Sequence, residues 1–253
     1  MTKNNQPRIL VVTSCTGEKV FKPDEQLGFK DFENKTQLAI EEQRLSQYMC
    51  SASEMYTGMQ HLRLMEGINL FRKSLGEKSI DVNILSAGYG LIAEDRSIAP
   101  YEVTFNNMKG HEVDAWSKHL GIREDFEKAV RDYDLVFLLL GENYLRSLNL
   151  PVITRSDQTF IFLASQSSRK WIKGLEAKTY ILGLSNADAK KYSYGLVGLK
   201  GFLFKKFAEV AVQEPELLSK LYAKPEEFAL LLEPKQENTD QLELTLGVPS
   251  MAV

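Results

Sequence analysis

The sequence has little of what would place it in a specialised class of protein. Two cysteines, Cys15 and Cys50, occur among 253 residues, too few for the disulfide framework of a small secreted domain. The three histidines, His61, His111 and His119, form no two-ligand helical motif, so we expect no metal and no other cofactor. No apolar run is long enough to span a membrane, and the N-terminus has no apolar signal segment. We therefore expect a reduced, cytoplasmic protein that does not bind membranes.

Charge and glycine spacing exclude further classes. The net charge is −3, so no global basic field indicates nucleic acid, although a local basic patch stays open. No segment has the spacing of a phosphate-binding P-loop or of the Gly-x-Gly-x-x-Gly dinucleotide motif. Both absences argue against a nucleotide hydrolase and against a dehydrogenase.

Short apolar runs alternate with segments of helical periodicity. The apolar runs predict five strands, at residues 8–13, 82–86, 135–140, 159–164 and 180–184, and the first is apolar enough to be buried on both faces. Helical patterning covers residues 36–48, 58–75, 112–119, 123–133, 200–212 and 214–222. This alternation predicts an α/β fold of three layers around a mainly parallel central sheet.

The same pattern suggests one domain. Residues 1–233 form a single α/β unit in this interpretation, and the helices of residues 36–75 are an insert or cap. Residues 234–253 are polar and aperiodic, which predicts a mobile tail.

The segment from Leu85 to Glu102 is the most informative part of the chain. A strand ends at Ser86 and passes into a glycine-rich loop that carries Tyr89, Asp95 and Tyr101. Acids and aromatic rings at the carboxyl end of a strand are typical of a binding site. The alternative is an ordinary surface loop with solvated charges.

Polar residues follow every predicted strand. Ligands of open parallel sheets bind outside the carboxyl ends of the strands, so we expect the site there. The loops concerned are 14–16, 86–89, 141–143, 166–168 and 185–186, which are rich in hydroxyls and amides. Cys15 is either a nucleophile or, without an evident histidine partner, a small pocket-lining thiol.

A glycine-led helix is the second notable feature. Three glycines within residues 193–201 precede a helix whose start carries Lys200. Free backbone N–H groups at a helix start attract phosphate, and glycine allows a close approach. The alternative is that glycine permits close helix packing and that the lysines are solvated.

These residues together resemble a known family, the YaaA-like group. The matching features are Ser14-Cys15 with Lys19, Tyr56-Thr57-Gly58, Leu85-Ser86-x-x-Tyr89-Gly90, Ile98-x-Pro100-Tyr101-Glu102 and the glycine-led final helix, and they span roughly residues 8–207. The first loop departs from the Cys-Ser-Lys type of that group, because Thr16-Gly17-Glu18 stands where a Ser-Lys or Lys-Lys pattern is usual.

A fainter similarity connects the chain to the uracil-DNA glycosylase superfamily, and it implies a fold of that kind. Residues 136–141 resemble its third-strand motif and residues 186–207 its last motif. The His-Pro-Ser-Pro sequence is absent, and Asn186 stands near the histidine position. The Gly-Gln-Asp-Pro-Tyr of the first loop is absent too. A uracil-specific activity is therefore not expected.

The resemblance implies an enzyme that flips a modified nucleobase out of DNA and hydrolyses its N-glycosidic bond. Carboxylates or amides near the sugar would act in catalysis, and we rank Asp95 first, then Glu102 and Glu18, with Asn186 as a further catalytic candidate. Base-binding candidates are Ser14, Cys15, Thr16, Lys19, Ser86, Tyr89 and Tyr101. Phosphate-binding candidates are Ser168, Arg169, Ser193, Gly198 and Lys200.

The expected partner is DNA with a modified base, bound by a monomeric enzyme. Family context suggests DNA damage repair or antiviral defence against phage with modified DNA. Two alternatives stay open: a non-catalytic DNA-binding stress protein, and an enzyme that processes free nucleosides or nucleotides.

Overall fold

The computed structural model describes residues 6–233, and the predicted mobile tail, 234–253, lies outside the described residues. Its centre is a six-stranded sheet. The strands are β1 (Ile9–Ser14), β3 (Ile80–Ser86), β4 (Gly90–Ala93), β6 (Leu135–Leu139), β7 (Thr159–Ser165) and β8 (Lys178–Leu184), in the order β4-β3-β1-β6-β7-β8. All neighbours are parallel except β3 and β4. The prediction of an α/β fold with a mainly parallel sheet is confirmed.

Strand β1 lies in the middle of the sheet because its side chains are apolar on both faces. Ile9, Leu10, Val11 and Val12 are almost completely buried, as expected for a central parallel strand. Ile9 aligns with Ile80 of β3 on one side and with Leu135 of β6 on the other. The polar residues that follow Val12 therefore arrive at the carboxyl edge between β3 and β6.

The edge strand β4 departs from the prediction. Residues 90–93 were expected to be loop, but they turn back and pair antiparallel with β3, from Ser86 opposite Gly90 to Asn83 opposite Ala93. Gly90 allows this tight reversal because its φ is +74°, a conformation that side chains disfavour. The hairpin carries the chain after Ala93 toward the amino end of β3.

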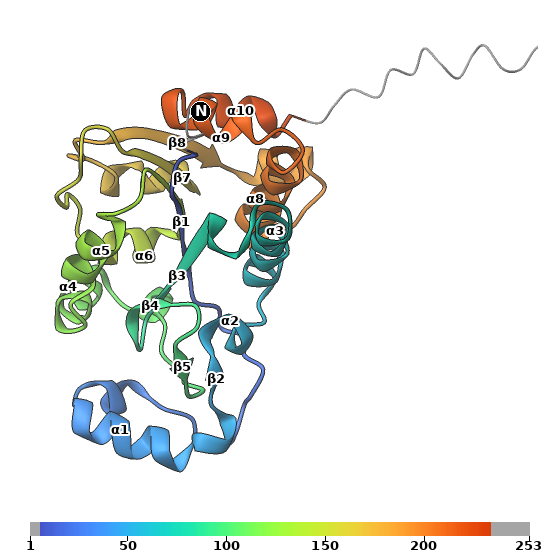
Figure 1. Cartoon of the computed structure of the whole chain (residues 1–253). Coiled ribbons are helices and arrows are strands. Elements are labelled where there is room, and N and C mark those ends of the chain that lie inside the picture. Colours follow the sequence, from blue (N-terminus) through green and yellow to red (C-terminus); the bar gives the residue numbers. More distant parts are fainter. Residues whose placement is uncertain (1–5, 234–253) are drawn as a thin grey trace, which may run out of the picture.

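Helices cover both faces of the sheet (Figure 1). Helices α3 (Met59–Leu75) and α8 (Leu199–Ala211) lie on one side, and α4 (Gly110–His119), α5 (Ile122–Val130) and α6 (Glu142–Ser147) on the other. Helices α9 (Glu216–Ala223) and α10 (Glu227–Leu231) follow α8. Within residues 6–233, no helix combines the length and the apolar character needed to cross a membrane.

Helices α3 and α8 touch through glycine. A side chain at Gly201 would lie 2.0 Å from the carbonyl oxygen of Gln60, and one at Gly67 would lie 3.0 Å from the Cα of Lys205. Helix α3 is therefore part of the main body. Of the expected insert at residues 36–75, only α1 (Lys35–Arg44) lies apart from the sheet in Figure 1.

Short elements complete the chain. They are the strands β2 (Cys50–Ser51) and β5 (Ser97–Ile98), the helices α2 (Ala52–Met55) and α7 (Asn186–Lys191), and the 3-10 helices η1 (Phe29–Phe32), η2 (Ser46–Tyr48), η3 (Glu77–Ser79), η4 (Phe105–Asn107) and η5 (Gln166–Trp171).

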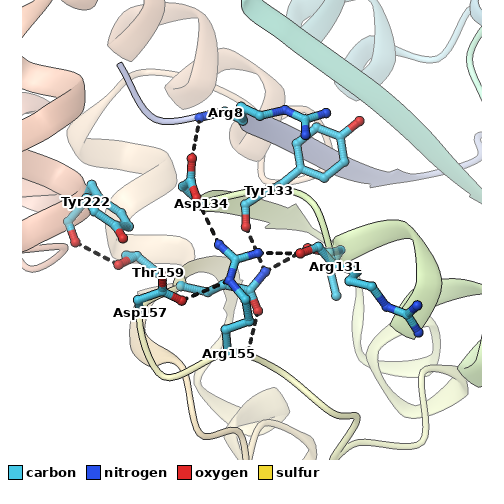
Figure 2. A network of polar contacts seen from close by, with 10 residues as sticks. Arg8, Arg131, Tyr133, Asp134, Arg155, Asp157, Thr159 and Tyr222 are labelled. Atoms are coloured by element: carbon cyan, nitrogen blue, oxygen red, sulfur yellow. Dashed lines mark hydrogen bonds and ion pairs between the residues drawn. The ribbon is translucent and has the colours of Figure 1, made fainter. Parts of the chain in front are cut away.

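A polar network closes the amino end of the sheet (Figure 2). The Arg155 guanidinium donates to Asp134 and to Asp157, both at 2.9 Å, and also to the carbonyl oxygen of Arg131. Asp134 in turn accepts from the backbone N–H of Arg8 at 2.9 Å. The network joins the starts of β1 and β6 to the loop before β7, and Arg155 forms ion pairs with both aspartates.

Candidate functional site

The carboxyl edge of the sheet contains a topological switch point. From β1 the chain continues to β3 on one side, and it later returns to β6 on the other side. Loops that leave neighbouring strands in opposite directions leave a crevice between them, and open α/β sheets bind ligands in this crevice. The gap between the ends of β1 and β6 is therefore the place where the fold predicts a site.

Two adjoining cavities occupy this place. We call them the Phe29 cavity, of about 410 Å³, and the Lys200 cavity, of about 540 Å³, after residues that line only one of them. Five residues line both: Cys15, Thr16, Gly17, Asn106 and Tyr144. Because they share this wall, we treat the two cavities as parts of one cleft.

Cys15 is at the centre of the shared wall. Its backbone N–H continues the strand ladder by donating to the carbonyl oxygen of Leu85 at 3.0 Å. Its Sγ lies 3.1 Å from the hydroxyl of Tyr144. The side chain is 8% exposed, and this small exposed part faces the cleft. The interpretation as a pocket-lining thiol fits this position, and no histidine lines either cavity.

Lys19 places a buried positive charge in the Phe29 cavity. The residue is only 7% exposed, and its ammonium lies 4.4 Å from the centre of the Tyr101 ring. Between residues 6 and 233, no carboxylate lies within ion-pairing distance of its nitrogen. Burial lowers the pKa of Lys19, and the nearby Cys15 and Glu102 partly oppose this effect. A desolvated cation without a partner is costly, unless a ligand supplies the missing charge.

A buried chain of hydroxyl groups supports the wall behind Lys19. The Ser86 hydroxyl accepts from the backbone N–H groups of Gly88 and Tyr89, at 3.2 and 2.9 Å. Its own hydrogen is then free for the Tyr101 hydroxyl at 2.7 Å, and Tyr101 lies 2.8 Å from the Tyr56 hydroxyl. Burial raises the pKa of both tyrosines well above its usual value. They therefore stay protonated and fix the ring on which Lys19 lies.

An aromatic surface forms the rim of the Phe29 cavity. The Phe29 ring is 42% exposed and lies over Trp116, with 4.0 Å between the ring centres and 31° between the planes. A hydrogen bond holds Trp116 in place, because its indole N–H donates to the carbonyl oxygen of Ala87 at 2.7 Å. The rim thus offers a flat ring to a flat ligand.

The Lys200 cavity combines a basic group with a protruding apolar turn. Burial lowers the pKa of Lys200 to about 8, and between residues 6 and 233 no carboxylate forms an ion pair with it. The neighbouring Leu196 and Val197 are 44% and 85% exposed. Gln60 of α3 also lines this cavity, and its amide donates to the carbonyl oxygen of Leu139 at 3.1 Å, which connects α3 to the end of β6.

Seven of the residues predicted from the sequence line the cleft: Ser14, Cys15, Thr16, Glu18, Lys19, Glu102 and Lys200. Ser86 and Tyr101 lie behind it in the chain of hydroxyl groups. Tyr89 also lies in this supporting layer, since its hydroxyl accepts from the backbone N–H of Ala99 at 3.0 Å.

The structure does not bring Asp95 to the cleft. The β3–β4 hairpin carries this exposed residue toward the amino end of β3, into a separate depression that it shares with Asp81 and Glu94. Asn186 begins α7 after the edge strand β8 and lines neither cavity.

Most of the expected phosphate ligands also lie outside the cleft. Ser168 is buried beside Ser165, and Arg169 donates to Gln166 at 2.7 Å. Ser193 lines a different depression, between α7 and α8. Gly198 is buried, and a side chain there would meet Tyr194 and Met59. Close packing, the alternative reading of the glycines, accounts for Gly198 and Gly201.

Several residues of the cleft were not predicted: Phe29, Gln60, Asn106 and Tyr144. A signal existed for Tyr144, which lies in the first turn of α6, after the Gly141 that follows β6. Phe29 and Asn106 stand in segments without periodicity. Within residues 6–233, no group of three or more His, Cys, Asp or Glu side chains is arranged to hold a metal ion.

Comparison with known proteins gives a family but no activity. The sequence pattern of DUF6884, described as a family of unknown function, matches residues 41–177, more than half of the 253 residues. No curated protein matches the chain.

Proposed function

The chain belongs to DUF6884, and because the function of this family is unknown we propose one from the cleft: a DNA glycosylase-like enzyme that flips a modified nucleobase and excises it. The resemblance to the uracil-DNA glycosylase superfamily supports the same proposal, and with it a fold of that kind. DNA is the proposed partner of a monomeric, cytoplasmic enzyme that acts in repair or in defence against phage.

Lys19 is the observation that carries this proposal. Cleavage of an N-glycosidic bond leaves the bonding electron pair on the departing base, which becomes negative. An unpaired, desolvated ammonium that lines a cavity large enough for a base stabilises that charge more strongly than water does. Phe29 on the rim supplies the stacking surface that a flipped base requires.

The Lys200 cavity suits the sugar and phosphate of the same nucleotide. Lys200 can pair with a phosphate oxygen, because no protein carboxylate within residues 6–233 neutralises it. The exposed Leu196 and Val197 stand beside this cavity. Apolar side chains of this kind can fill the gap that a flipped base leaves in the stack. This apolar turn favours DNA over a free nucleoside as substrate.

Glu18 is the carboxylate best placed to act at the sugar. It lines the Lys200 cavity, and its hydrogen bond from Lys22 at 2.7 Å lowers its pKa. An ionised carboxylate can accept the proton of the attacking water and stabilise the cationic sugar. In this scheme water adds to C1′ and its proton passes to Glu18. The bond between C1′ and the base breaks, and the base leaves with the electron pair of this bond. Lys19 donates a hydrogen bond to the negatively charged base.

The test is direct detection of a released base. The full chain is incubated with a panel of genomic DNAs that carry different modified bases, and with the matching free nucleosides. Mass spectrometry identifies any released base, and alkaline cleavage counts abasic sites. We expect release from one class of modified DNA. Release from nucleosides alone would support a nucleoside-processing enzyme instead, and DNA binding without any release would support a non-catalytic protein.

A further inference from the structure

Lys200 and Lys205 belong to the same helix, α8, but have different surroundings. The Lys205 ammonium lies 2.8 Å from the Glu66 carboxylate. Lys200, in the first turn of α8, lines the Lys200 cavity together with the apolar side chain of Met59. Within residues 6–233, no carboxylate forms an ion pair with Lys200. Lys205 is thus held in a structural ion pair, whereas the amine of Lys200 is open to whatever enters the cavity.

The surroundings of Lys200 favour its neutral form. Burial lowers the pKa of Lys200 to about 8, and the first turn of a helix disfavours a positive charge. Both protonation states are therefore populated near neutral pH. The charged form can pair with a DNA phosphate, as in the proposed function. The neutral form carries a free electron pair, and a lysine amine in this state is a nucleophile toward carbonyl carbon atoms.

Base excision would create such a carbonyl group in this cavity. Once the base has left, the deoxyribose is in equilibrium between a closed ring and an open chain with an aldehyde at C1′. In the proposed function the sugar lies in the Lys200 cavity, so this aldehyde forms beside the Lys200 amine. The cavity, of about 540 Å³, is lined by the Glu18 carboxylate as well. A nucleophile and a proton acceptor thus line the same cavity.

We propose that the protein has a second activity, in which Lys200 cuts the DNA strand at the abasic site through an imine with the sugar. The amine adds to C1′ and water leaves, which forms a protonated imine. The C2′ proton then passes to Glu18, and the electrons of the C2′–H bond expel the phosphate by breaking the bond between C3′ and its oxygen. Water finally hydrolyses the imine and frees Lys200. This inference rests on the position of the sugar in the proposed function, but it does not require the step that releases the base.

Trapping with borohydride tests the imine directly. The full chain is incubated with a duplex that already carries an abasic deoxyribose, and sodium borohydride reduces any protonated imine to a stable amine. We expect a covalent protein–DNA complex, and mass spectrometry of its peptides should place the cross-link on Lys200. A duplex with a tetrahydrofuran analogue, which has no aldehyde, should give no complex. Strand cleavage is measured on a gel in a parallel reaction without borohydride.

One variant and its control separate a nucleophile from a phosphate contact. Lys200→Arg keeps a positive charge but cannot form an imine. It should still bind the tetrahydrofuran duplex, lose the trapped complex, and cleave abasic DNA at least about 10²-fold more slowly, because a removed nucleophile has no substitute. Lys128→Met, at an exposed lysine on α5, should trap and cleave like the wild type. A circular dichroism melt checks that both variants are folded, and the cross-link is mapped on the wild-type protein in any case.

The outcomes separate this activity from base release. No trapped complex on abasic DNA, a cross-link at a lysine other than Lys200, or cleavage by Lys200→Arg at the wild-type rate would each overturn it. If abasic DNA is cut through Lys200 but no modified DNA loses a base, the strand cleavage stands and the glycosylase activity fails. If modified bases are released while the abasic strands stay intact and no complex is trapped, the glycosylase activity stands and the strand cleavage fails.

Discussion

Arg155 at the amino end of the central sheet and two lysines at its carboxyl end differ in whether their charges are paired. At the amino end, Arg155 is surrounded by acceptors and pairs with two aspartates (Figure 2). At the carboxyl end, Lys19 and Lys200 face cavities, and within residues 6–233 neither has a carboxylate partner. A paired charge stabilises the fold, whereas a desolvated charge without a partner destabilises it. The difference indicates that Arg155 has a structural role and that the two lysines are available to a ligand.

The largest effect should follow from removing the charge of Lys19. We expect Lys19→Met to lower the single-turnover rate of base release by about 10²- to 10³-fold, the usual contribution of one preorganised electrostatic contact. Its melting temperature should stay the same or rise, because a desolvated charge is lost. Lys128→Met, at an exposed lysine on α5, is the control and should change neither quantity. A melting temperature that falls with activity would make Lys19 structural.

The opposite result is expected at the amino end. Arg155→Met removes donors to Asp134, Asp157 and the Arg131 carbonyl, so we expect it to lower the free energy of unfolding by about 2 kcal/mol. Urea denaturation measures this change. The rate of base release per folded molecule should equal that of the wild type. A lower rate at unchanged stability would mean that the network acts on the cleft.

The sequence predicts the sheet better than it predicts the site. Strands β1, β6 and β7 are apolar runs buried on both faces, which the sequence pattern identifies directly. Strand β3 is interrupted by Asp81 and Asn83, and the edge strand β8 is only partly buried, but each still contains an apolar run that marks its position. The hairpin to β4 is not visible in this way, because Gly88-Tyr89-Gly90 reads as the start of a loop and the strand that follows has four residues. The error displaced Asp95, which the hairpin returns to the amino end of β3.

The site depends on contacts between distant segments. Lys19 could be identified as a donor after the first strand, but its burial depends on the ring of Tyr101, which is far along the chain. Phe29 has no sequence signal, because its role comes from stacking on Trp116 of α4. The sequence predicts Lys200 as a ligand-binding residue because it lies at the start of a helix. The packing roles of Gly198 and Gly201 could not be predicted in this way, because they depend on where α3 lies.

A smaller effect is expected for the apolar turn. Val197→Ser should lower base release from duplex DNA by about 10-fold, because unstacking a base costs a few kcal/mol that the wedge partly offsets. Release from single-stranded DNA should be unchanged. Ile153→Ser, at an apolar residue that is 78% exposed outside the cleft, is the matched control. Equal losses of activity on duplex and single-stranded DNA would show that Val197 does not fill the gap left by the flipped base.

Lys200 should show a pH-dependent effect on stability. Its pKa of about 8 in the folded protein lies below the ordinary 10.5, so the unfolded chain binds more protons between these values and stability rises with pH across this window. Lys200→Met should therefore raise the melting temperature most below pH 8, and the gain should shrink toward pH 10.5.

The same variant should reduce the salt dependence of DNA binding by about one phosphate contact. An unchanged salt slope would exclude Lys200 from the phosphate site.

The smallest effect is expected for Asp95→Asn. This residue lines neither cavity, so base release should stay within about 2-fold of the wild-type rate, as for a surface substitution away from any site. Single-turnover kinetics on the same DNA measures it. A loss of about 100-fold would return the catalytic role to the amino end of β3 and contradict the position of the cleft.

The most direct test of the cleft uses the two cysteines as reporters. Cys15 lines both cavities, whereas Cys50 lies in β2, outside them. The rate of alkylation by iodoacetamide is measured at each cysteine by mass spectrometry, with and without a duplex that carries a tetrahydrofuran abasic-site analogue. The account predicts that this DNA slows alkylation of Cys15 at least about 5-fold and leaves Cys50 unchanged. Unchanged alkylation of Cys15 by saturating DNA would contradict a ligand site at the carboxyl end of the sheet.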